Sequence, residues 1–299
     1  MDTVKKIDIH VHSSESAWFS RPPDRRYATP AELIAIYDRI GVERGVLLPS
    51  INVEGDFQLS SNYEMKLVAD KYPDRFSWFC NIDPRQGYNA PETDFTPYLL
   101  TCMENGARGV GEICANLPFD DPLMKNLFYH CEKNGLPVIF HIGNRGRDYG
   151  IVDSFGLPGL EGALAGFPKL RFFGHSQKFW AEISGDLKPE ERDGYPTGPV
   201  APGGRLVTLM RTYPNLCCDL SAGSGYNAMT RDPAFGYAFM EEFSDRLYYG
   251  TDICDPANIG SPMLKLAAFL DEGLTTGRLS PEAYYRISRG NAEKVLGLV

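Results

Sequence analysis

The chain has 299 residues, a net charge of −9 and 43% hydrophobic residues. An acidic chain repels a phosphate backbone, so we expect no nucleic-acid partner. No segment approaches the roughly 18 apolar residues of a membrane span, and the N-terminus lacks the apolar core of a signal peptide. The seven cysteines are scattered and form no Cys-x-x-Cys motif, which argues against a disulfide framework and favours a cytoplasmic protein.

Short apolar runs alternate with longer amphipathic runs along the whole sequence, which predicts strands alternating with helices. The predicted strands cover residues 4–12, 42–50, 76–82, 108–114, 137–143, 169–176, 215–221 and 246–252. The first predicted helix begins at Thr29-Pro30, an N-cap followed by proline, and ends at Gly41. Further helices are predicted over residues 62–72, 97–106, 121–135, 158–167, 205–213, 233–243, 263–273 and 281–298, with a long loop over 177–204.

Eight such units predict a fold of the α/β class, a (β/α)8 TIM barrel that forms a single domain over residues 1–299. A doubly wound sheet would need a glycine-rich phosphate turn after the first strand. The sequence at that point is His-Val-His-Ser-Ser, so we favour the barrel.

Histidines and carboxylates gather at the ends of the predicted strands, which form the catalytic face of a barrel. His10 and His12 end the first strand, and their spacing of two places both imidazoles on one face. The later strands carry Glu112, His141, His175, Asp219 and Asp252 at or near their ends. Imidazoles and carboxylates suit zinc, manganese or iron, so the pattern predicts a divalent metal site at the barrel mouth.

Each of these residues also has a structural interpretation when it is taken alone. A carboxylate after a strand is often a loop or helix cap, and this applies most to Asp219. Glu112 could pair with an arginine inside the barrel instead of binding a metal. His130, the fifth histidine, lies in a predicted helix, where we expect it to be packed. The metal interpretation therefore rests on the joint pattern.

Several motifs resemble those of the amidohydrolase superfamily, in order and over nearly the whole chain: IDIHVH, HIG, GHS, PNLCCDLSA, YYGTD and the closing RISRGNAEKVLGL. The most similar branch includes aminocarboxymuconate-semialdehyde decarboxylase, resorcylate decarboxylases and pyrone-dicarboxylate lactonase. The metal ligands that this resemblance implies are His10, His12, His141 and Asp252. It also implies that His175 is the catalytic acid/base.

The segment VGEI departs from that branch and resembles TatD-type hydrolases. In those enzymes the corresponding glutamate is a metal ligand and can bridge two ions, which implies Glu112 as a further ligand. We therefore expect one or two divalent ions, with Zn²⁺ as the first choice and Mn²⁺ or Fe²⁺ as alternatives.

Three functions are compatible with such a site. The first is a metal-dependent hydrolase of a small ester, lactone or amide, in which Asp252 accepts a proton from a metal-activated water. The second is a non-oxidative decarboxylase of a small aromatic or unsaturated carboxylic acid. The third is a non-catalytic metal-binding barrel, which we disfavour because His175 and Asp252 exceed the needs of a closed structural zinc site. We favour hydrolysis and keep decarboxylation as the alternative.

The expected partner is a small-molecule substrate, bound by the loops that follow the strands. The candidate contacts are Trp18, Arg21 and Arg145, an aromatic wall and two partners for a substrate carboxylate. Further candidates in these loops are Arg25, Arg26, Arg147, Lys178 and Trp180. For each cation the alternative is a solvated position on the surface. The oligomeric state stays open, and a homo-oligomer is compatible with the sequence.

Overall fold

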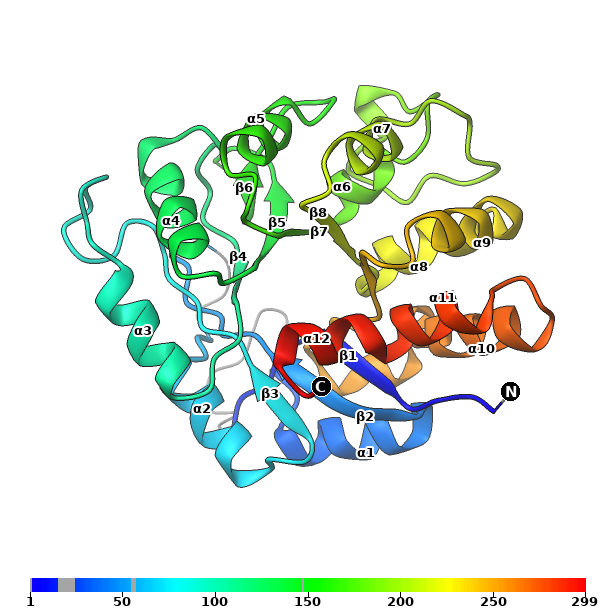
Figure 1. Ribbon diagram of the computed structural model, residues 1–299, viewed down its shortest axis with the longest axis horizontal. Coiled ribbons are helices and arrows are strands. Elements are labelled where there is room, and N and C mark those ends of the chain that lie inside the picture. The colour runs from blue at the N-terminus through cyan, green and yellow to red at the C-terminus, as the bar shows by residue number, and fades with distance from the viewer. Residues whose placement is uncertain (1, 16–24, 55–57, 147) are drawn as a thin grey trace.

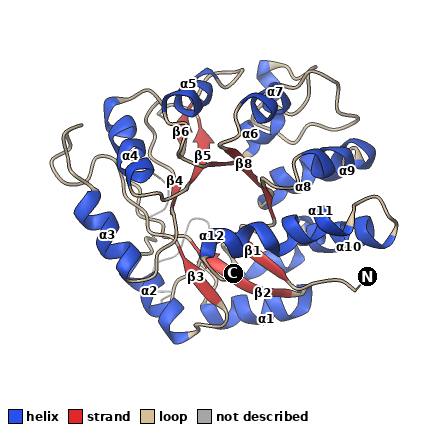
Figure 2. Ribbon diagram, in the orientation of Figure 1, coloured by secondary structure: helices blue, strands red, loops and turns tan. Residues whose placement is uncertain are grey.

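The computed structural model describes residues 2–15, 25–54, 58–146 and 148–299. Within these residues, eight parallel strands form an inner ring and the helices lie outside it (Figure 1, Figure 2). The strands of the ring are β1 (Lys6–Val11), β2 (Val42–Leu47), β3 (Phe76–Trp78), β4 (Val110–Ile113), β5 (Val138–Gly143), β7 (Phe172–His175), β8 (Leu216–Asp219) and β9 (Leu247–Tyr248).

Two isolated parallel bridges close the ring where the strand ladders stop. Cys80, which follows β3, bridges Val110 of β4. Val11 of β1 bridges Ile253, which follows β9. The predicted TIM barrel is therefore confirmed.

The surrounding helices largely follow the predicted ones. They are α1 (Pro30–Ile40), α2 (Asn62–Lys71), α3 (Thr96–Glu104), α4 (Pro122–Lys133), α5 (Pro158–Gly166), α6 (Gln177–Ala181), α7 (Arg205–Thr212), α8 (Ala222–Thr230), α9 (Pro233–Glu242), α10 (Leu266–Thr275), α11 (Pro281–Tyr285) and α12 (Asn291–Leu296). The predicted cap of α1 is present, because Thr29 and Glu32 form a reciprocal capping box. Among the helices of the described residues, none is both long and apolar enough to cross a membrane.

Apolar side chains fill the barrel interior, and α12 packs against one end of it. The cluster combines Ile7, Ile9, Val46, Leu48, Phe79, Ile139, Phe173, Cys217 and Tyr248 with Ala292, Val295 and Leu296 of α12. Arg108, which precedes β4, donates to the carbonyl of Leu296, so α12 covers the end where the strands begin. The polar side chains of the candidate site lie at the opposite end, where the strands finish.

Two strands change register before they reach their functional residues. On β1 the shift lies between Asp8 and Val11. Ile7 and Ile9 face the barrel interior, and because of the shift the next residue, His10, faces inward as well. On β4 the shift lies between Val110 and Ile113, in the stretch that contains Glu112. An extra residue in a strand reverses the alternation of side chains beyond it, which re-aims both strand ends toward the barrel axis.

The structure differs from the predicted elements in four places. Residues 177–204, predicted as a loop, begin with α6, whose cap Ser176 accepts a hydrogen bond from Phe179. The glycine-rich α8 was not predicted, because its sequence has poor helix propensity. An additional strand, β6 (Ile151–Val152), pairs with β5. β9 ends at Tyr248 instead of continuing to Asp252, which adopts a left-handed backbone with φ of 56°.

Candidate metal centre

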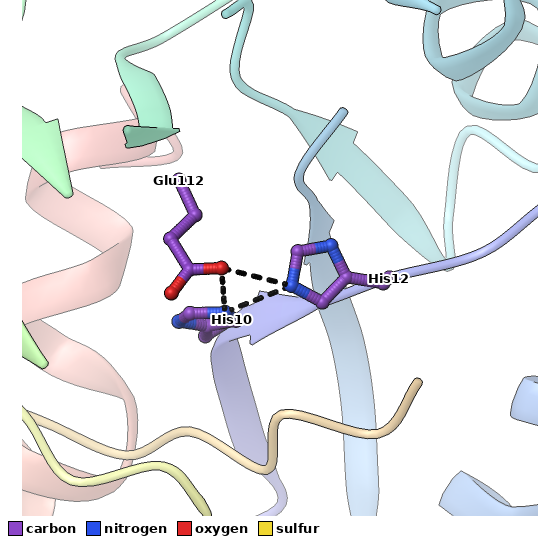
Figure 3. A group of neighbouring side chains, drawn as sticks. All are labelled: His10, His12 and Glu112. Carbon is purple, nitrogen blue, oxygen red and sulfur yellow. Dashed lines mark hydrogen bonds and ion pairs between the residues drawn. The ribbon is translucent and has the colours of Figure 1, made fainter. Parts of the chain in front are cut away.

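His10 and His12 direct the same ring nitrogen toward one point at the end of β1 (Figure 3). Their Nε2 atoms lie 3.1 Å apart, and both side chains are buried. The Nδ1 of His10 lies 2.6 Å from Oδ2 of Asp219, and the Nδ1 of His12 lies 3.0 Å from the carbonyl of Leu48. Because these oxygens accept hydrogen bonds, each neutral imidazole carries its proton on Nδ1 and presents the lone pair of Nε2.

Glu112 from β4 completes this first group of side chains (Figure 3). Its Oε2 lies 3.4 Å from Nε2 of His12 and 3.6 Å from Nε2 of His10. Its Oε1 lies 2.9 Å from Nδ1 of His141 on β5 and 3.8 Å from Nε2 of His175 on β7. Glu112 therefore lies between all four histidines of the site, and among the described residues it forms no ion pair with an arginine.

His175 approaches the same point from the end of β7, and Asp252 approaches it from the segment after β9. Oδ1 of Asp252 lies 3.6 Å from Nε2 of His10 and 3.7 Å from Nε2 of His12. Its Oδ2 lies 3.8 Å from Nε2 of His175. The backbone N–H of Asp252 donates to the carbonyl of His10 at 2.8 Å, which ties the segment after β9 to β1.

This donor set fits a divalent cation. Two lone pairs that face each other at 3.1 Å repel unless a proton or a cation lies between them. Glu112 and Asp252 add carboxylate oxygens within the same small volume, and two neutral imidazoles with carboxylates suit Zn²⁺, Mn²⁺ or Fe²⁺. Three overlapping groups each bring three ligand atoms within 4.8 Å of one another: His10, His12 and Glu112; His10, His175 and Asp252; and Glu112, His141 and His175.

The carboxylates of the site favour a positive charge among the histidines. Burial opposes protonation of His10, but Asp219 and Glu112 nevertheless raise its pKa well above the usual range. Burial likewise opposes ionisation of Glu112, yet His10 lowers the pKa of that carboxyl well below its usual value. The carboxylates thus stabilise a positive charge at this position, and a bound metal ion would supply it.

Asp219 contacts the buried ring of His10 and also caps its own loop. Its Oδ1 accepts the backbone N–H of Ser221 at 3.0 Å, which is the structural role that the sequence suggested. Its Oδ2 orients His10 and also accepts the Ser221 hydroxyl at 3.0 Å. The same hydroxyl oxygen lies 3.0 Å from Nδ1 of His175. Ser221 was not predicted as a site residue, because its only signal in the sequence is its position at the end of a predicted strand.

A cavity of about 740 Å³ opens above this cluster. His12, Glu112, His141 and Asp252 line it, but His175 does not. The remaining walls are formed by Arg25, Tyr27, Pro49, Ser50, Asn52, Glu54, Cys114, Asn116, Gly146, Asp148, Tyr149 and Cys254. The site thus has an open side large enough for a small organic molecule.

Two features of the cavity wall bear on what it can bind. The ring of Tyr149 lies against that of His141, with centroids 4.6 Å apart, and offers a flat apolar face. Among the described residues, Arg25 is the only arginine or lysine that lines the cavity, and no described carboxylate forms an ion pair with it. Glu54, by contrast, is neutralised by Arg85 through two bonds of 2.6 and 2.7 Å.

The structure brings few of the other predicted substrate contacts to this cavity. Trp18, Arg21 and Arg147 lie outside the described residues. Arg145 is exposed and lines a different cavity of about 780 Å³, beside α5. Arg26 forms an ion pair with Glu32.

Three further residues that the sequence singled out are buried and do not line this cavity. Lys178 is buried and pairs with Asp193 at 2.5 Å. Trp180 is buried and donates from Nε1 to the carbonyl of Asp219. His130 lies on α4, where its Nδ1 is 2.8 Å from the hydroxyl of Thr96, as the packing interpretation predicted.

The fold and the buried cluster at the strand ends define a barrel with a candidate metal centre. The chain belongs to the amidohydrolase family, whose profile matches residues 7–298, and it is an enzyme of that superfamily. Among curated proteins, none matches the chain.

Solved structures share the barrel over its full length. An uncharacterised TIM-barrel protein from Bordetella bronchiseptica is 22% identical, with a TM-score of 0.65 and coverage of 98% of this chain and 99% of that one. A 5-carboxyvanillate decarboxylase from Sphingomonas paucimobilis is 15% identical, with a TM-score of 0.61 and coverage of 99% of both chains. A probable 2-pyrone-4,6-dicarboxylic acid hydrolase from Acinetobacter baumannii is 15% identical, with a TM-score of 0.57 and coverage of 98% and 100%. At these identities the likeness concerns the fold.

Proposed function

We propose that the protein is a metal-dependent, non-oxidative decarboxylase of a small aromatic or unsaturated carboxylic acid. The observation that carries the proposal is the buried cluster of histidines and carboxylates beneath an open cavity with an aromatic wall. The solved structures add support, because decarboxylases of 2,6-dihydroxybenzoate and of 5-carboxyvanillate share the barrel over nearly its whole length, with TM-scores of 0.60 and 0.61. This likeness favours decarboxylation over the hydrolysis that the sequence alone suggested.

The residues that would hold the metal are His10, His12, His141, Asp252 and Glu112. A bound divalent ion would withdraw negative charge from the substrate oxygens and so stabilise the electron pair left by the departing CO2. Asp219 and Leu48 keep the Nε2 atoms of His10 and His12 available, because each occupies the Nδ1 side of one ring.

Decarboxylation breaks the bond between the carboxyl group and its carbon, and the electron pair stays on that carbon. The carbon then takes up a proton, so the site must hold one nearby. Asp252 lines the cavity, and we assign the delivery of this proton to it. We assign to His175, whose Nε2 lies 3.8 Å from Oδ2 of Asp252, the role of sustaining the protonation of that carboxyl group.

The cavity wall is suited to a planar acid. Tyr149 presents a ring face next to the metal ligand His141, and an aromatic substrate can stack there. Asn116 fixes the segment that carries Tyr149, because its amide group donates to the carbonyls of Asn144 and Gly150. Arg25 offers a guanidinium group to a second acidic substituent of the substrate.

Hydrolysis of a small ester, lactone or amide is the second candidate, and Glu112 is the observation that favours it. Its two oxygens contact different pairs of histidines, which is the geometry of a carboxylate able to bridge two ions. Two ions are a common means of activating water for hydrolysis.

The test is to load the chelated protein with Zn²⁺, Mn²⁺ or Fe²⁺ and incubate each form with hydroxybenzoic acids, aromatic dicarboxylic acids, lactones and esters. We expect CO2 release from an aromatic acid, and in D2O the product should carry one deuterium at the carbon that lost CO2. Acid release from an ester or lactone without CO2 would show the hydrolase instead. Metal binding without turnover of any of these acids, lactones or esters would favour the non-catalytic barrel.

A further inference from the structure

A third, much smaller cavity lies between α6, α8 and the segment 194–196, outside the site described above. Its volume is about 10 Å³, which is the space of one water molecule or one small ion. Its lining consists of Gln177, Trp180, Ala181, Gly194, Tyr195, Pro196, Ser224, Asn227 and Arg231. Within this set there is no carboxylate, and the charged residue is Arg231.

Two residues of the lining each carry a polar atom that lacks a hydrogen-bond partner among the described residues. These atoms are Oγ of Ser224 and Nη2 of Arg231, and both atoms are buried. The Ser224 residue as a whole is only 3% exposed. A buried polar atom without a partner costs about 1–3 kcal/mol, and more if it is charged, so such atoms are rare in native proteins. Two of them on one small cavity indicate a ligand that accepts hydrogen bonds.

The charge and polarity of the lining favour an anion over a neutral ligand. Arg231 has no carboxylate within ion-pair distance in the described part of the chain. Burial lowers the pKa of Arg231, and the more distant Asp186 and Asp232 only oppose that effect. The hydroxyl oxygen of Tyr195 accepts a hydrogen bond from Nε2 of Gln177 at 3.2 Å. The hydroxyl hydrogen of Tyr195 can therefore be donated to an acceptor in the cavity.

We propose that this cavity binds a single halide ion, chloride under physiological conditions, between Nη2 of Arg231 and Oγ of Ser224. The ion joins two helices that follow strands of the metal centre. α6 begins two residues after His175, and α8 begins three residues after Asp219. Trp180, which lines the cavity, donates to the carbonyl of Asp219 at 3.1 Å. Bound halide therefore stabilises the loops behind His175 and Asp219.

The test is thermal unfolding of the chelated protein, with sodium chloride or bromide replacing sodium gluconate at constant ionic strength. Chelation removes any halide effect that acts through a metal. We expect Tm to rise and to saturate with halide, by about 2 °C or more at full occupancy. Ser224→Ala and Arg231→Gln should each lose this dependence. The matched control is Arg211→Gln, which changes an exposed arginine paired with Glu242 and should keep it.

A crystal soaked in bromide gives a direct second measurement. An anomalous peak within hydrogen-bond distance of Arg231 and Ser224 would establish the ion. A water molecule at this position, with no anomalous signal, would overturn the proposal. A halide-dependent Tm that persists unchanged in both Ser224→Ala and Arg231→Gln would also overturn it, because the effect would then arise elsewhere.

Discussion

Oδ2 of Asp219 lies 2.6 Å from Nδ1 of His10, and both side chains are fully buried at the end of the barrel. The carboxylate holds the proton of His10 on Nδ1 and so keeps the lone pair of Nε2 free. Asp219→Asn places an amide in this contact, whose N–H group favours the wrong tautomer. We expect metal affinity to fall about 10–100-fold while the fold persists, as measured by competition with a chelator. Unchanged affinity would show that Asp219 serves only as a loop cap.

His10→Ala and His12→Ala should each remove most of the bound metal. Each change deletes one of the two facing Nε2 atoms and leaves the remaining ligands around a larger gap. Elemental analysis of the purified variants measures the loss. His130→Ala is the matched control, because this histidine lies on α4 outside the cluster and should leave the metal content unchanged. Full metal content in the double variant would refute the site.

Glu112→Gln tests whether the carboxylate of β4 is a ligand. It contacts His12 and His141 through different oxygens, so the amide should weaken metal binding or reduce the number of ions from two to one. Metal titration monitored by calorimetry gives both quantities. Unchanged stoichiometry and affinity, together with lowered thermal stability, would instead indicate a purely structural carboxylate.

His175→Asn separates proton transfer from metal binding. His175 is buried and does not line the cavity, so the substitution should leave substrate access and the metal in place. Loss of an acid–base group typically costs about 10²–10⁴ in rate, and we expect kcat to fall within that range. Asp252→Asn should reduce both kcat and metal content, because Asp252 faces the ligands and the cavity. If His175→Asn loses its metal, His175 is a ligand.

The barrel and the residues that meet at its mouth could be predicted from the sequence, because both follow from local patterns. Apolar runs mark the strands, and parallel strands bring their ends to one face. Strict alternation from Ile7 and Ile9, however, would turn His10 outward. The register shift that turns it inward depends on how β1 pairs with β2, which a pattern within one strand does not contain.

Contacts between distant strands explain the other differences. Asp219 and His10 are separated by 209 positions, so a loop cap and a ligand-orienting carboxylate have the same local sequence signature. Arg145 was expected at the barrel mouth because it follows a strand. The additional strand β6 redirects that segment, so Gly146 and Tyr149 line the site cavity while Arg145 lines the cavity beside α5.

Arg25 provides the last prediction, which concerns substrate choice. Among the described residues it is the arginine of the cavity wall, and no carboxylate of that set forms an ion pair with it. A ligand with two acidic groups can place one at the metal and the other at this guanidinium. Arg25→Gln should therefore weaken binding of isophthalate to the metal-loaded protein by about tenfold, or about 1.4 kcal/mol, and leave benzoate nearly unaffected.

Calorimetry of both ligands measures this difference without any knowledge of the natural substrate. Arg26→Gln is the matched control, since its neighbouring guanidinium is held by Glu32 and does not line the cavity. It should bind both ligands as the wild type does. If Arg25→Gln weakens benzoate and isophthalate equally, Arg25 contributes only general attraction to anions. If it weakens neither, the second acidic group does not reach this wall of the cavity, and Arg25 is a solvated cation at the rim.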